Sequence, residues 1–431
     1  MSEAFRLGIA GLGTVGAGVV KNIQQHDDVL AARAGRRVTI TAVSARDKTR
    51  DRGVDLSGYA WVDDAADLAA QDDVDCVVEL VGGSEGLALD LVRAALSNGK
   101  HVVTANKALL AHHGAELAAL AEENNVGLLY EAAVAGGIPI IKALREGFAG
   151  NDIRAVFGIL NGTSNYILTE MRETGRDFAD VLKEAQDLGY AEADPSFDID
   201  GDDAGHKLAL LAAIAFGTKP DFKSLRMTGI RDITSVDIAM ARELGYRIKL
   251  LGIARRLNGK VMQVLEPCLV PTSSKIAAVD GVFNAVQVEG DFVDQSLLVG
   301  RGAGQGPTAS SVLSDVIDLA RGINVPTFGV PARDLKDPDW VDLGESVAGY
   351  YLRFDVLDQA GVIADISAIL RDHNVSIESF IQHGRDPGQP VTLVMITHEA
   401  RQADIAAACK AIEGLDCVNA APRLIRIEDL A

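Results

Sequence analysis

The sequence has 431 residues, 48% of them hydrophobic, and a formal net charge of −20 at pH 7. This length allows two or three domains with a sizeable core, and the negative charge argues against nucleic-acid or membrane-surface partners because it repels phosphate groups. No apolar run approaches the length of a membrane span and the first residues do not resemble a signal peptide, so we expect a cytoplasmic protein.

The first elements form a nucleotide-binding pattern. Residues 5–10 are a short apolar strand, and the turn Gly11-Leu-Gly-Thr-Val-Gly16 joins it to a helix with apolar residues at helical spacing. The first glycine permits the tight turn, the second lets a pyrophosphate approach the backbone, and the third lets helix and strand pack closely. The phosphates would rest on the helix N-terminus. The predicted cofactor contacts in this turn are Gly11, Gly13, Thr14, Val15 and Gly16.

The end of the second strand bears on which dinucleotide binds. Strand 38–43 is followed by Ser44-Ala-Arg-Asp-Lys48, where an acid would ordinarily hold the adenosine ribose. A serine with basic residues after it fits a ribose 2′-phosphate better than a 2′-hydroxyl. We therefore expect NADP, contacted by Arg46. Asp47 leaves NAD open, and Arg46 could also be a solvated loop charge.

Lys107 follows a later strand of the same segment. The run His101-Val-Val-Thr-Ala-Asn-Lys107 leads from a strand into the helix 108–124. A lysine just past the carboxyl end of a strand lies where ligands bind in open parallel sheets. Lys107 could polarise a carbonyl group or hold a cofactor, with Thr104 as a further cofactor contact. A surface lysine at a helix start fits the pattern as well.

An acidic stretch, residues 189–207, precedes an apolar helix. Asp203 and Lys207 are four residues apart, so on a helix they share one face. One interpretation is a well-capped helix start, because acids there meet unpaired N–H groups. The other is a polar pocket that holds an ammonium group beside a proton-transferring lysine. The acids are Glu192, Asp194, Asp198, Asp200, Asp202 and Asp203.

Residues 139–307 predict a second, α+β domain. A helix over 139–147 is expected first, and the strands of a mostly open sheet are expected at 153–160, 248–254, 261–270 and 286–288. The glycine-rich run 300–306 precedes a helix expected at 312–321, where Gly304 is the predicted cofactor contact. We expect this helix to pack on the first domain, which would then comprise residues 1–138 and about 308–345.

The last segment, 348–431, follows a linker rich in proline and aspartate. Its expected order of strands and helices is βαββαβ, with strands at 350–356, 376–382, 391–397 and 423–427 and helices at 364–373 and 404–412. This order, with Leu357-Asp-Gln-Ala-Gly-Val362 and Asn374-Val-Ser-Ile377, resembles an ACT domain. Such modules bind amino acids at the first strand–helix loop. A small oligomerisation domain is the alternative.

Five motifs together resemble the homoserine dehydrogenase family, in its order and spacing over residues 5–345. The resemblance is to the monofunctional form with a C-terminal ACT domain, without the kinase domain of bifunctional members. It implies an α/β fold with a Rossmann-type doubly wound nucleotide-binding domain and a catalytic domain that also makes a homodimer, possibly extended to a tetramer. The motifs are Gly11–Gly16, Thr104–Lys107, Glu131–Ile138, Asn161–Ile167 and Gly189–Pro195.

The resemblance also implies an activity and its residues. The family reduces L-aspartate 4-semialdehyde to L-homoserine with NAD(P)H, on the route to threonine and methionine. Lys207 matches the lysine that exchanges a proton with the substrate oxygen, and Lys107 matches a lysine beside the nicotinamide. The acids that match or could join the substrate-binding set are Glu192, Asp203 and, in second rank, Asp198.

Two further sites follow from the resemblance. The family holds a monovalent cation, usually sodium, and oxygen-only ligation suits such a hard ion. Without the resemblance, Glu131 would be only an acid near a glycine turn. Threonine feedback inhibition is expected at the ACT loop, through Asp358, Gly361 and Val362. The cation ligands would be Glu131 and the carbonyl groups of Val134, Gly136 and Ile138.

The residue chemistry favours direct hydride transfer. An aldehyde that accepts a hydride develops an alkoxide, which needs a positioned proton donor. A thioester route would need a nucleophilic cysteine, and the scattered cysteines, which we expect to be reduced, lie in no polar turn near the motifs. The alternatives are a non-catalytic NADP-binding amino-acid sensor, disfavoured by both lysines, and another semialdehyde or imine reductase, disfavoured by the 189–195 motif. The cysteines are Cys76, Cys268, Cys409 and Cys417.

Overall fold

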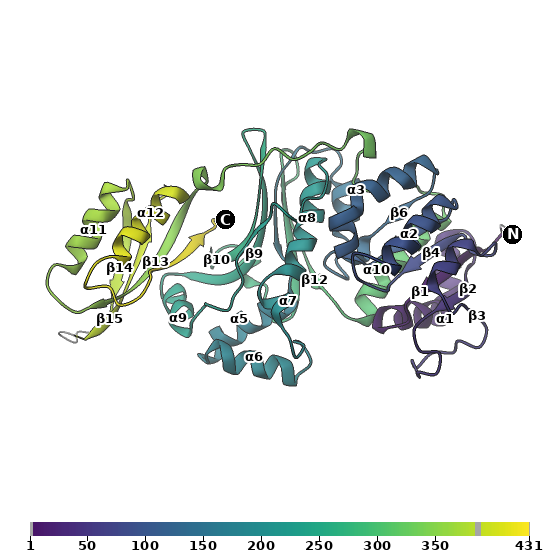
Figure 1. Ribbon diagram of the computed structural model, residues 1–431, viewed down its shortest axis with the longest axis horizontal. Coiled ribbons are helices and arrows are strands. Elements are labelled where there is room, and N and C mark those ends of the chain that lie inside the picture. The colour runs from purple at the N-terminus through teal and green to yellow at the C-terminus, as the bar shows by residue number, and fades with distance from the viewer. Residues whose placement is uncertain (1–2, 384–388, 431) are drawn as a thin grey trace.

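The computed structural model describes residues 3–383 and 389–430 of the chain. The domain limits predicted at residues 1 and 431 therefore lie outside the described residues. Figure 1 shows three parts in a row, with the nucleotide-binding part at one end, a central part, and the C-terminal part at the other end. Among the described helices, none combines the length and the apolar composition needed to cross a membrane.

The first part is a parallel sheet in the doubly wound order β3-β2-β1-β4-β5-β6, as the glycine turn predicts. Its helices are α1 (Thr14–Ala34), α2 (Leu87–Ser97) and α3 (Lys107–Glu123). Strands β1, β4, β5 and β6 are largely buried, which explains their apolar runs, whereas the edge strand β3 is partly exposed. They are β1 (Phe5–Ala10), β2 (Val38–Ser44), β3 (Ala60–Trp61), β4 (Cys76–Glu79), β5 (His101–Thr104) and β6 (Leu128–Leu129).

A helix from much later in the chain packs on this sheet. Helix α10 (Gln305–Ala320) lies against α1, where Gly18 allows close contact with Ala309. The expected start at residue 312 is wrong by about two turns, because Gly304, at φ 115°, is the N-cap. A proline at position 307 did not prevent the helix, since the first turn needs no N–H from it.

The central part is an antiparallel sheet in the order β12-β11-β7-β9-β10. Helices α5 (Gly162–Thr174) and α8 (Asp202–Phe216) pack on it. The expected helix over 139–147 is one α turn, α4 (Ile140–Lys142), followed by a π turn over Ala143–Gly147. Sequence reasoning missed β12 and α9 (Ser235–Glu243). The strands are β7 (Ile153–Ile159), β8 (Arg226–Met227), β9 (Tyr246–Leu257), β10 (Lys260–Pro271), β11 (Phe283–Gly290) and β12 (Asp294–Arg301), and the other helices are α6 (Phe178–Asp187) and α7 (Ser196–Ile199).

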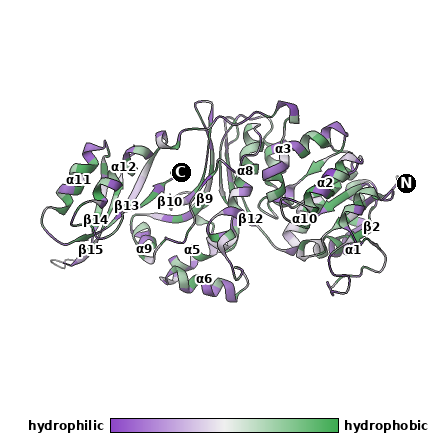
Figure 2. Ribbon diagram, in the orientation of Figure 1, coloured by the Kyte–Doolittle hydropathy of each residue, from purple (hydrophilic) through white to green (hydrophobic). Residues whose placement is uncertain are grey.

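The C-terminal part has the predicted βαββαβ order, with its strands arranged β17-β13-β15-β14. Helix α11 carries green and purple residues by turns in Figure 2, and its buried residues Val362, Ile366 and Leu370 face the sheet. The elements are β13 (Val347–Leu357), α11 (Val362–Asp372), β14 (Ile377–Gln382), β15 (Pro390–Thr397), β16 (Ala400–Arg401), α12 (Gln402–Glu413) and β17 (Arg423–Ile427).

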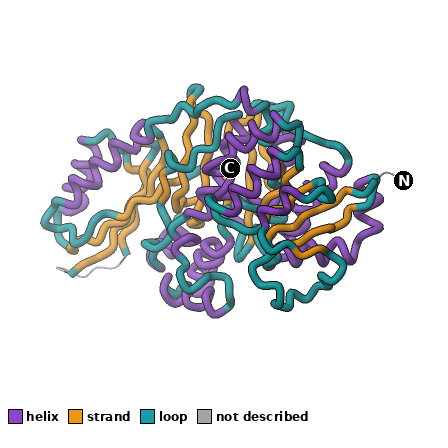
Figure 3. Tube along the Cα trace, turned by 45° about the vertical axis from the view of Figure 1, so that its right-hand side comes forward, coloured by secondary structure: helices purple, strands orange, loops and turns teal. Residues whose placement is uncertain are grey.

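The last strand joins the two sheets. On one side β17 pairs with β13, and on the other it pairs in parallel with β10 through Cys268↔Arg426 and Leu269↔Ile427. The central and C-terminal sheets therefore form one continuous sheet, which crosses the middle of the molecule in Figure 3. The predicted α/β fold class, with Rossmann, central and ACT-like parts, is confirmed.

Candidate active site

The glycine turn leaves an open helix N-terminus. Gly11 has φ 94°, and a Cβ there would lie 2.5 Å from Leu80 O. Gly16 could not carry a Cβ either, because it packs against the carbonyl group of Gly11. Gly13 is the N-cap of α1, without a side-chain cap, and nothing lies within 4 Å of its Cβ position. This combination leaves room for a phosphate beside the positive end of a helix dipole.

The loop after β2 presents a free positive charge. Arg46 is exposed just beyond the end of the strand. The Asp47 carboxylate accepts hydrogen bonds from the Thr49 hydroxyl (2.7 Å) and the Thr49 N–H (2.8 Å), which lower its pKa. Lys48 lies 5.6 Å from the Trp61 ring centroid. Asp47 makes these hydrogen bonds within its own loop rather than with Arg46. The exposed guanidinium group of Arg46 is therefore available to an anionic partner.

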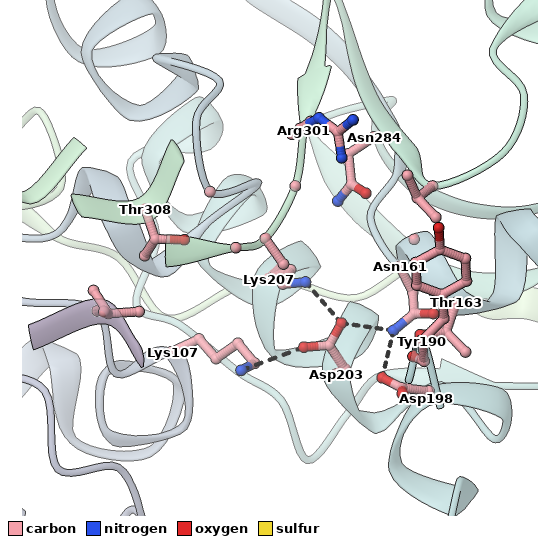
Figure 4. Close-up of a pocket in the computed structure, with 18 of the residues that line it drawn as sticks. Lys107, Asn161, Thr163, Tyr190, Asp198, Asp203, Lys207, Asn284, Arg301 and Thr308 are labelled. Carbon is pink, nitrogen blue, oxygen red and sulfur yellow. Dashed lines mark hydrogen bonds and ion pairs between the residues drawn. The ribbon is translucent and has the colours of Figure 1, made fainter. Parts of the chain in front are cut away.

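A cavity of about 630 Å³ lies between the nucleotide-binding and central parts. Figure 4 shows its polar side chains converging from α3, α8 and the start of α5. Thr308 of α10 closes the side nearest the glycine turn. The cavity thus joins the predicted cofactor turn to the predicted substrate residues. Its lining includes Val15, Lys107, Asn161, Tyr190, Glu192, Asp198, Asp203, Lys207, Asn284, Arg301, Gly304 and Thr308.

Lys207 and Asp203 form a buried ion pair one helical turn apart. Lys207 Nζ donates to Asp203 Oδ2 at 2.7 Å and to the carbonyl oxygen of Leu160 at 2.8 Å. Burial lowers the pKa of Lys207, while the Asp203 carboxylate opposes that shift. Burial disfavours the charged form of Asp203, yet Lys207 and then Lys107 hold its pKa well below the usual range.

Lys107 approaches the same carboxylate from the other domain. Its Nζ lies 3.3 Å from Asp203 Oδ1 and 5.6 Å from the Phe197 ring centroid. The residue begins α3, and Asn106 caps that helix by accepting from Leu109 N. The geometry favours a site lysine over a surface lysine. Figure 4 shows both lysines directed at Asp203.

Asn161 holds the half-buried Asp198 and the buried Asp203 together. Its Nδ2 donates to Asp198 Oδ1 at 2.7 Å and to Asp203 Oδ2 at 2.8 Å, while its Oδ1 caps α5 by accepting from Ser164 N. Burial raises the pKa of Asp198. Sequence reasoning gave Asn161 no role, although an Asn-Gly pair before a helix is a recognisable N-cap signal.

The acids of the stretch 189–207 divide into those that line the cavity and those that bond elsewhere. Glu192 is exposed at the cavity, and Gln186 Nε2 donates to its carbonyl oxygen at 3.0 Å. Asp194 accepts from Ser196 N at 3.1 Å, and Asp200 pairs with Arg231. The N-cap of α8 is Gly201, so the interpretation as a helix start does not apply to Asp200, whereas Asp202 and Asp203 do lie in the first turn of that helix. Only three of the six acids therefore reach the cavity: Glu192, Asp198 and Asp203.

The predicted cation ligands lie in one buried turn. Glu131 accepts from Ile141 N at 2.9 Å and Lys142 N at 2.8 Å, and burial raises its pKa to about 7. The carbonyl group of Gly136 accepts from Ser311 Oγ at 2.7 Å, and that of Ile138 accepts from Ile140 N at 2.8 Å. Each oxygen keeps a second lone pair. This set, with Val134, fits a hard monovalent cation by donor chemistry.

The predicted regulatory residues lie at the β13–α11 turn of the C-terminal part. Gly361 has φ 102° and is the N-cap of α11, and Val362 is the first, buried residue of that helix. Asp358 N donates to Gln389 O at 2.9 Å. None of the three lines the cavity between the first two parts.

The chain matches three family models. The model described as "Homoserine dehydrogenase, NAD binding domain" covers residues 11–131, and "Homoserine dehydrogenase" covers residues 139–317. The model "ACT domain" covers residues 350–417. The matches follow one another without overlap, in the order in which the three parts of the fold lie.

Relatives match along nearly the full chain. A homoserine dehydrogenase of Neisseria gonorrhoeae is 47% identical, over 99% of each chain. The crystal structure of a homoserine dehydrogenase from Thiobacillus denitrificans superimposes with a TM-score of 0.94 at 43% identity, over 100% of this chain and 99% of that one. A hyperthermophilic archaeal homoserine dehydrogenase in complex with NADPH is 27% identical over 73% of this chain and 97% of that one, with a TM-score of 0.63. With such identity and coverage, this chain belongs to the homoserine dehydrogenase family.

Proposed function

We propose that this chain reversibly reduces L-aspartate 4-semialdehyde to L-homoserine by direct hydride transfer. The observation that carries the proposal is the Asp203 carboxylate, held between Lys207 and Lys107 in the cavity beside the nucleotide-binding turn. The proposed acid–base lysine, cofactor turn and substrate acids therefore border one space. The family and its named relatives support the same reaction.

In reduction, Lys207 would give a proton to the substrate oxygen, and the nicotinamide, when bound, would supply the hydride to the carbonyl carbon. The aldehyde thereby becomes an alcohol, and Lys207 is left as a neutral amine that must regain a proton before the next reduction. In oxidation, the neutral amine of Lys207 takes the hydroxyl proton. Burial lowers its pKa, which increases the fraction of neutral amine that can accept the hydroxyl proton at a given pH. Asp203 and Leu160 O fix the amine, so the transfer geometry is set before substrate arrives.

Glu192 and Asp198 are the proposed partners of the substrate ammonium group. Glu192 is exposed and Asp198 half-buried at the cavity, at sites that a small amino acid can reach. Lys107 would stand beside the nicotinamide, since it follows β5, which ends at Thr104, and lines the cavity together with Gly304.

NADP is the proposed cofactor, with NAD as the alternative. The exposed Arg46 and the internally bonded Asp47 favour a 2′-phosphate over a free 2′-hydroxyl. The archaeal relative solved with NADPH supports this choice. The remaining cofactor contacts are proposed at Gly11, Gly13, Thr14, Val15 and Gly16.

Further parts of the proposal concern the cation, the assembly and the effector. Sodium would bind Glu131 with the carbonyl groups of Val134, Gly136 and Ile138. A homodimer, possibly a tetramer, is proposed from the family, and the exposed Val299 on edge strand β12 supports contact there.

Threonine is the proposed effector, and it would bind at Asp358, Gly361 and Val362. A cytoplasmic location suits the reduced, scattered cysteines.

The deciding experiment is homoserine-dependent reduction of NADP, with Lys207→Ala as the matched variant. We expect turnover by the intact chain and a loss of at least about a hundredfold in kcat for Lys207→Ala. A non-catalytic amino-acid sensor would bind NADP without turnover. Activity that survives the substitution would remove Lys207 from its role.

A further inference from the structure

A second, smaller cavity lies where the C-terminal part meets the central part. Its volume is about 130 Å³, and β8, β10, β13 and β17 contribute to its walls. It shares no residue with the active-site cavity. We call it the joint cavity. Its charged and hydrogen-bonding side chains include Arg226, Glu266, Tyr350, Gln402, Arg423 and Arg426.

Two polar atoms in this lining are buried and have no hydrogen-bond partner among the described residues: Tyr350 Oη and Arg423 Nε. Tyr350 is only 2% exposed. A buried hydroxyl without a partner costs free energy, and such groups are rare in native proteins. Tyr350 lines the cavity, and the charged groups that act on its hydroxyl include three of the same lining, Arg426, Glu266 and Arg226, with Glu428 outside it.

The charges around the joint cavity suit a zwitterion. Arg226 NH2 lies 3.3 Å from Glu266 Oε2, and Arg426 Nε lies 2.9 Å from Glu428 Oε2. A guanidinium group has five N–H donors, so one ion pair leaves donors for a ligand carboxylate. Glu266 offers a carboxylate to an ammonium group. The space equals that of about four liquid waters at roughly 30 Å³ each, which suits a ligand of about six to nine non-hydrogen atoms.

We propose that the joint cavity binds a small α-amino acid. Its carboxylate would take hydrogen bonds from the Tyr350 hydroxyl and from Arg423 and Arg426, and its ammonium group would pair with Glu266. This site is distinct from the effector residues of the proposed function, which lie at the β13–α11 turn. Binding here goes beyond the catalytic reaction and does not depend on it.

A short chain of contacts connects the joint cavity to the active site. Thr228, in the cavity wall, donates its N–H to Leu265 O at 2.8 Å. Two residues later, Ile230 N donates to Ile199 O at 2.9 Å, and Gly229 packs on the same carbonyl group. Ile199 lies in α7, next to Asp198. A ligand that shifts this loop would move Asp198, so occupancy of the joint cavity should change the KM for homoserine more than kcat.

The test is calorimetric titration of the full chain with glycine, L-alanine, L-serine and L-threonine, one at a time. We expect at least one to bind, and Tyr350→Phe to weaken that binding by about tenfold, because a buried hydrogen bond is lost. Glu266→Gln should weaken the binding of the amino acid but not the binding of acetate, which has no ammonium group. As the matched control, Glu413→Gln, exposed at the end of α12 and outside the cavity lining, should leave this binding unchanged.

Several results would overturn the proposal. No heat with any of the four up to about 10 mM would mean a cavity that holds water only. Binding that neither Tyr350→Phe nor Glu266→Gln affects would place the ligand elsewhere. Acetate that binds as tightly as the amino acid would mean a simple anion site. Melting curves confirm that the variants fold. Because binding is read directly, a failure here is separate from a failure of homoserine turnover.

Discussion

At the scale of single residues, Asp203 is the most informative group of the active site. One buried carboxylate accepts from Lys207 and Asn161 and pairs with Lys107, so it sets the charge balance of the cavity. The spacing of Asp203 and Lys207 could be predicted from the sequence because it depends on one helix. The approach of Lys107, almost a hundred residues away in the chain, could not.

Asp203→Asn should lower kcat for homoserine oxidation by about a hundredfold and move the pH profile. The Asp203 carboxylate raises the pKa of Lys207, so its removal lowers that pKa further. In the proposed mechanism, Lys207 must be neutral to accept the hydroxyl proton. The rising limb of kcat against pH should therefore shift to lower pH. Asp202→Asn is the control, and an unmoved limb in Asp203→Asn would contradict the pairing.

Arg46→Ala should shift cofactor preference from NADP toward NAD. The loss of a charge-assisted contact with the 2′-phosphate predicts about a tenfold or greater rise in KM for NADP, with little change for NAD. The control is Arg37→Ala, next to the opposite end of β2, where Arg37 pairs with Asp27. If the ratio of kcat/KM for the two cofactors stays constant, Arg46 does not contact the phosphate.

At the scale of elements, the junction of β7 and α5 organises the site. Leu160 O accepts from Lys207 Nζ, and Asn161 caps α5 while it bridges Asp198 and Asp203. The sequence indicates a strand, a cap and a helix here, because these are local patterns. It does not indicate the bridge, whose partners lie 37 and 42 residues away. The same limit explains the missed β12, whose partner strand decides its structure.

Substitutions at Asn161 should separate capping from bridging. Asn161→Ser keeps a cap acceptor but loses both amide donors, whereas Asn161→Ala loses the cap as well, at about 1 kcal/mol. We expect both variants to raise the KM for homoserine by about tenfold, since both release the acids. Only Asn161→Ala should show the lower free energy of unfolding in urea. A wild-type KM for Asn161→Ser would mean that Asn161 serves only the helix.

The turn from Glu131 to Lys142 predicts a pH-dependent response to sodium. Burial raises the pKa of Glu131 to about 7, so the ionised form that would bind a cation appears only as pH rises through that value. Sodium should therefore raise the melting temperature more at about pH 8 than at about pH 6, relative to choline. Nearby Asp315, with a pKa raised to about 6, also titrates. Glu131→Gln should abolish the difference between the sodium effects at the two pH values. An equal gain in melting temperature at both pH values would argue against the site.

At the scale of the whole molecule, the C-terminal part is tied into the central part. Arg353 Nε donates to Asp237 Oδ1 at 2.8 Å, and Tyr351 donates to the same oxygen at 3.2 Å, where Asp237 is fully buried. With the β17–β10 pairing, these contacts join two domains that the sequence separates by a linker. The three-part order of the fold was predictable from motifs, whereas this joint was not, because it rests on contacts more than a hundred residues apart.

Deletion of residues 346–431 should therefore cost stability as well as regulation. It removes β17 from β10 and both partners of Asp237, so the melting temperature should fall by roughly 2–4 °C for each kcal/mol lost. Threonine should inhibit the intact chain and not the shortened one, which should keep homoserine turnover. An intact enzyme that ignores millimolar-scale threonine would exclude the regulatory proposal.

The place of β17 also has a consequence for synthesis on the ribosome. Residues 423–427 emerge after every other strand that the structure describes, yet they lie in the interior of the sheet, between β10 and β13. Until they emerge, the nascent chain holds two strand edges without the partner that will join them. Unpaired edges are templates for aggregation. A late translational pause or a premature stop near residue 420 would leave a chain that has all its proposed catalytic residues but whose sheet is still open.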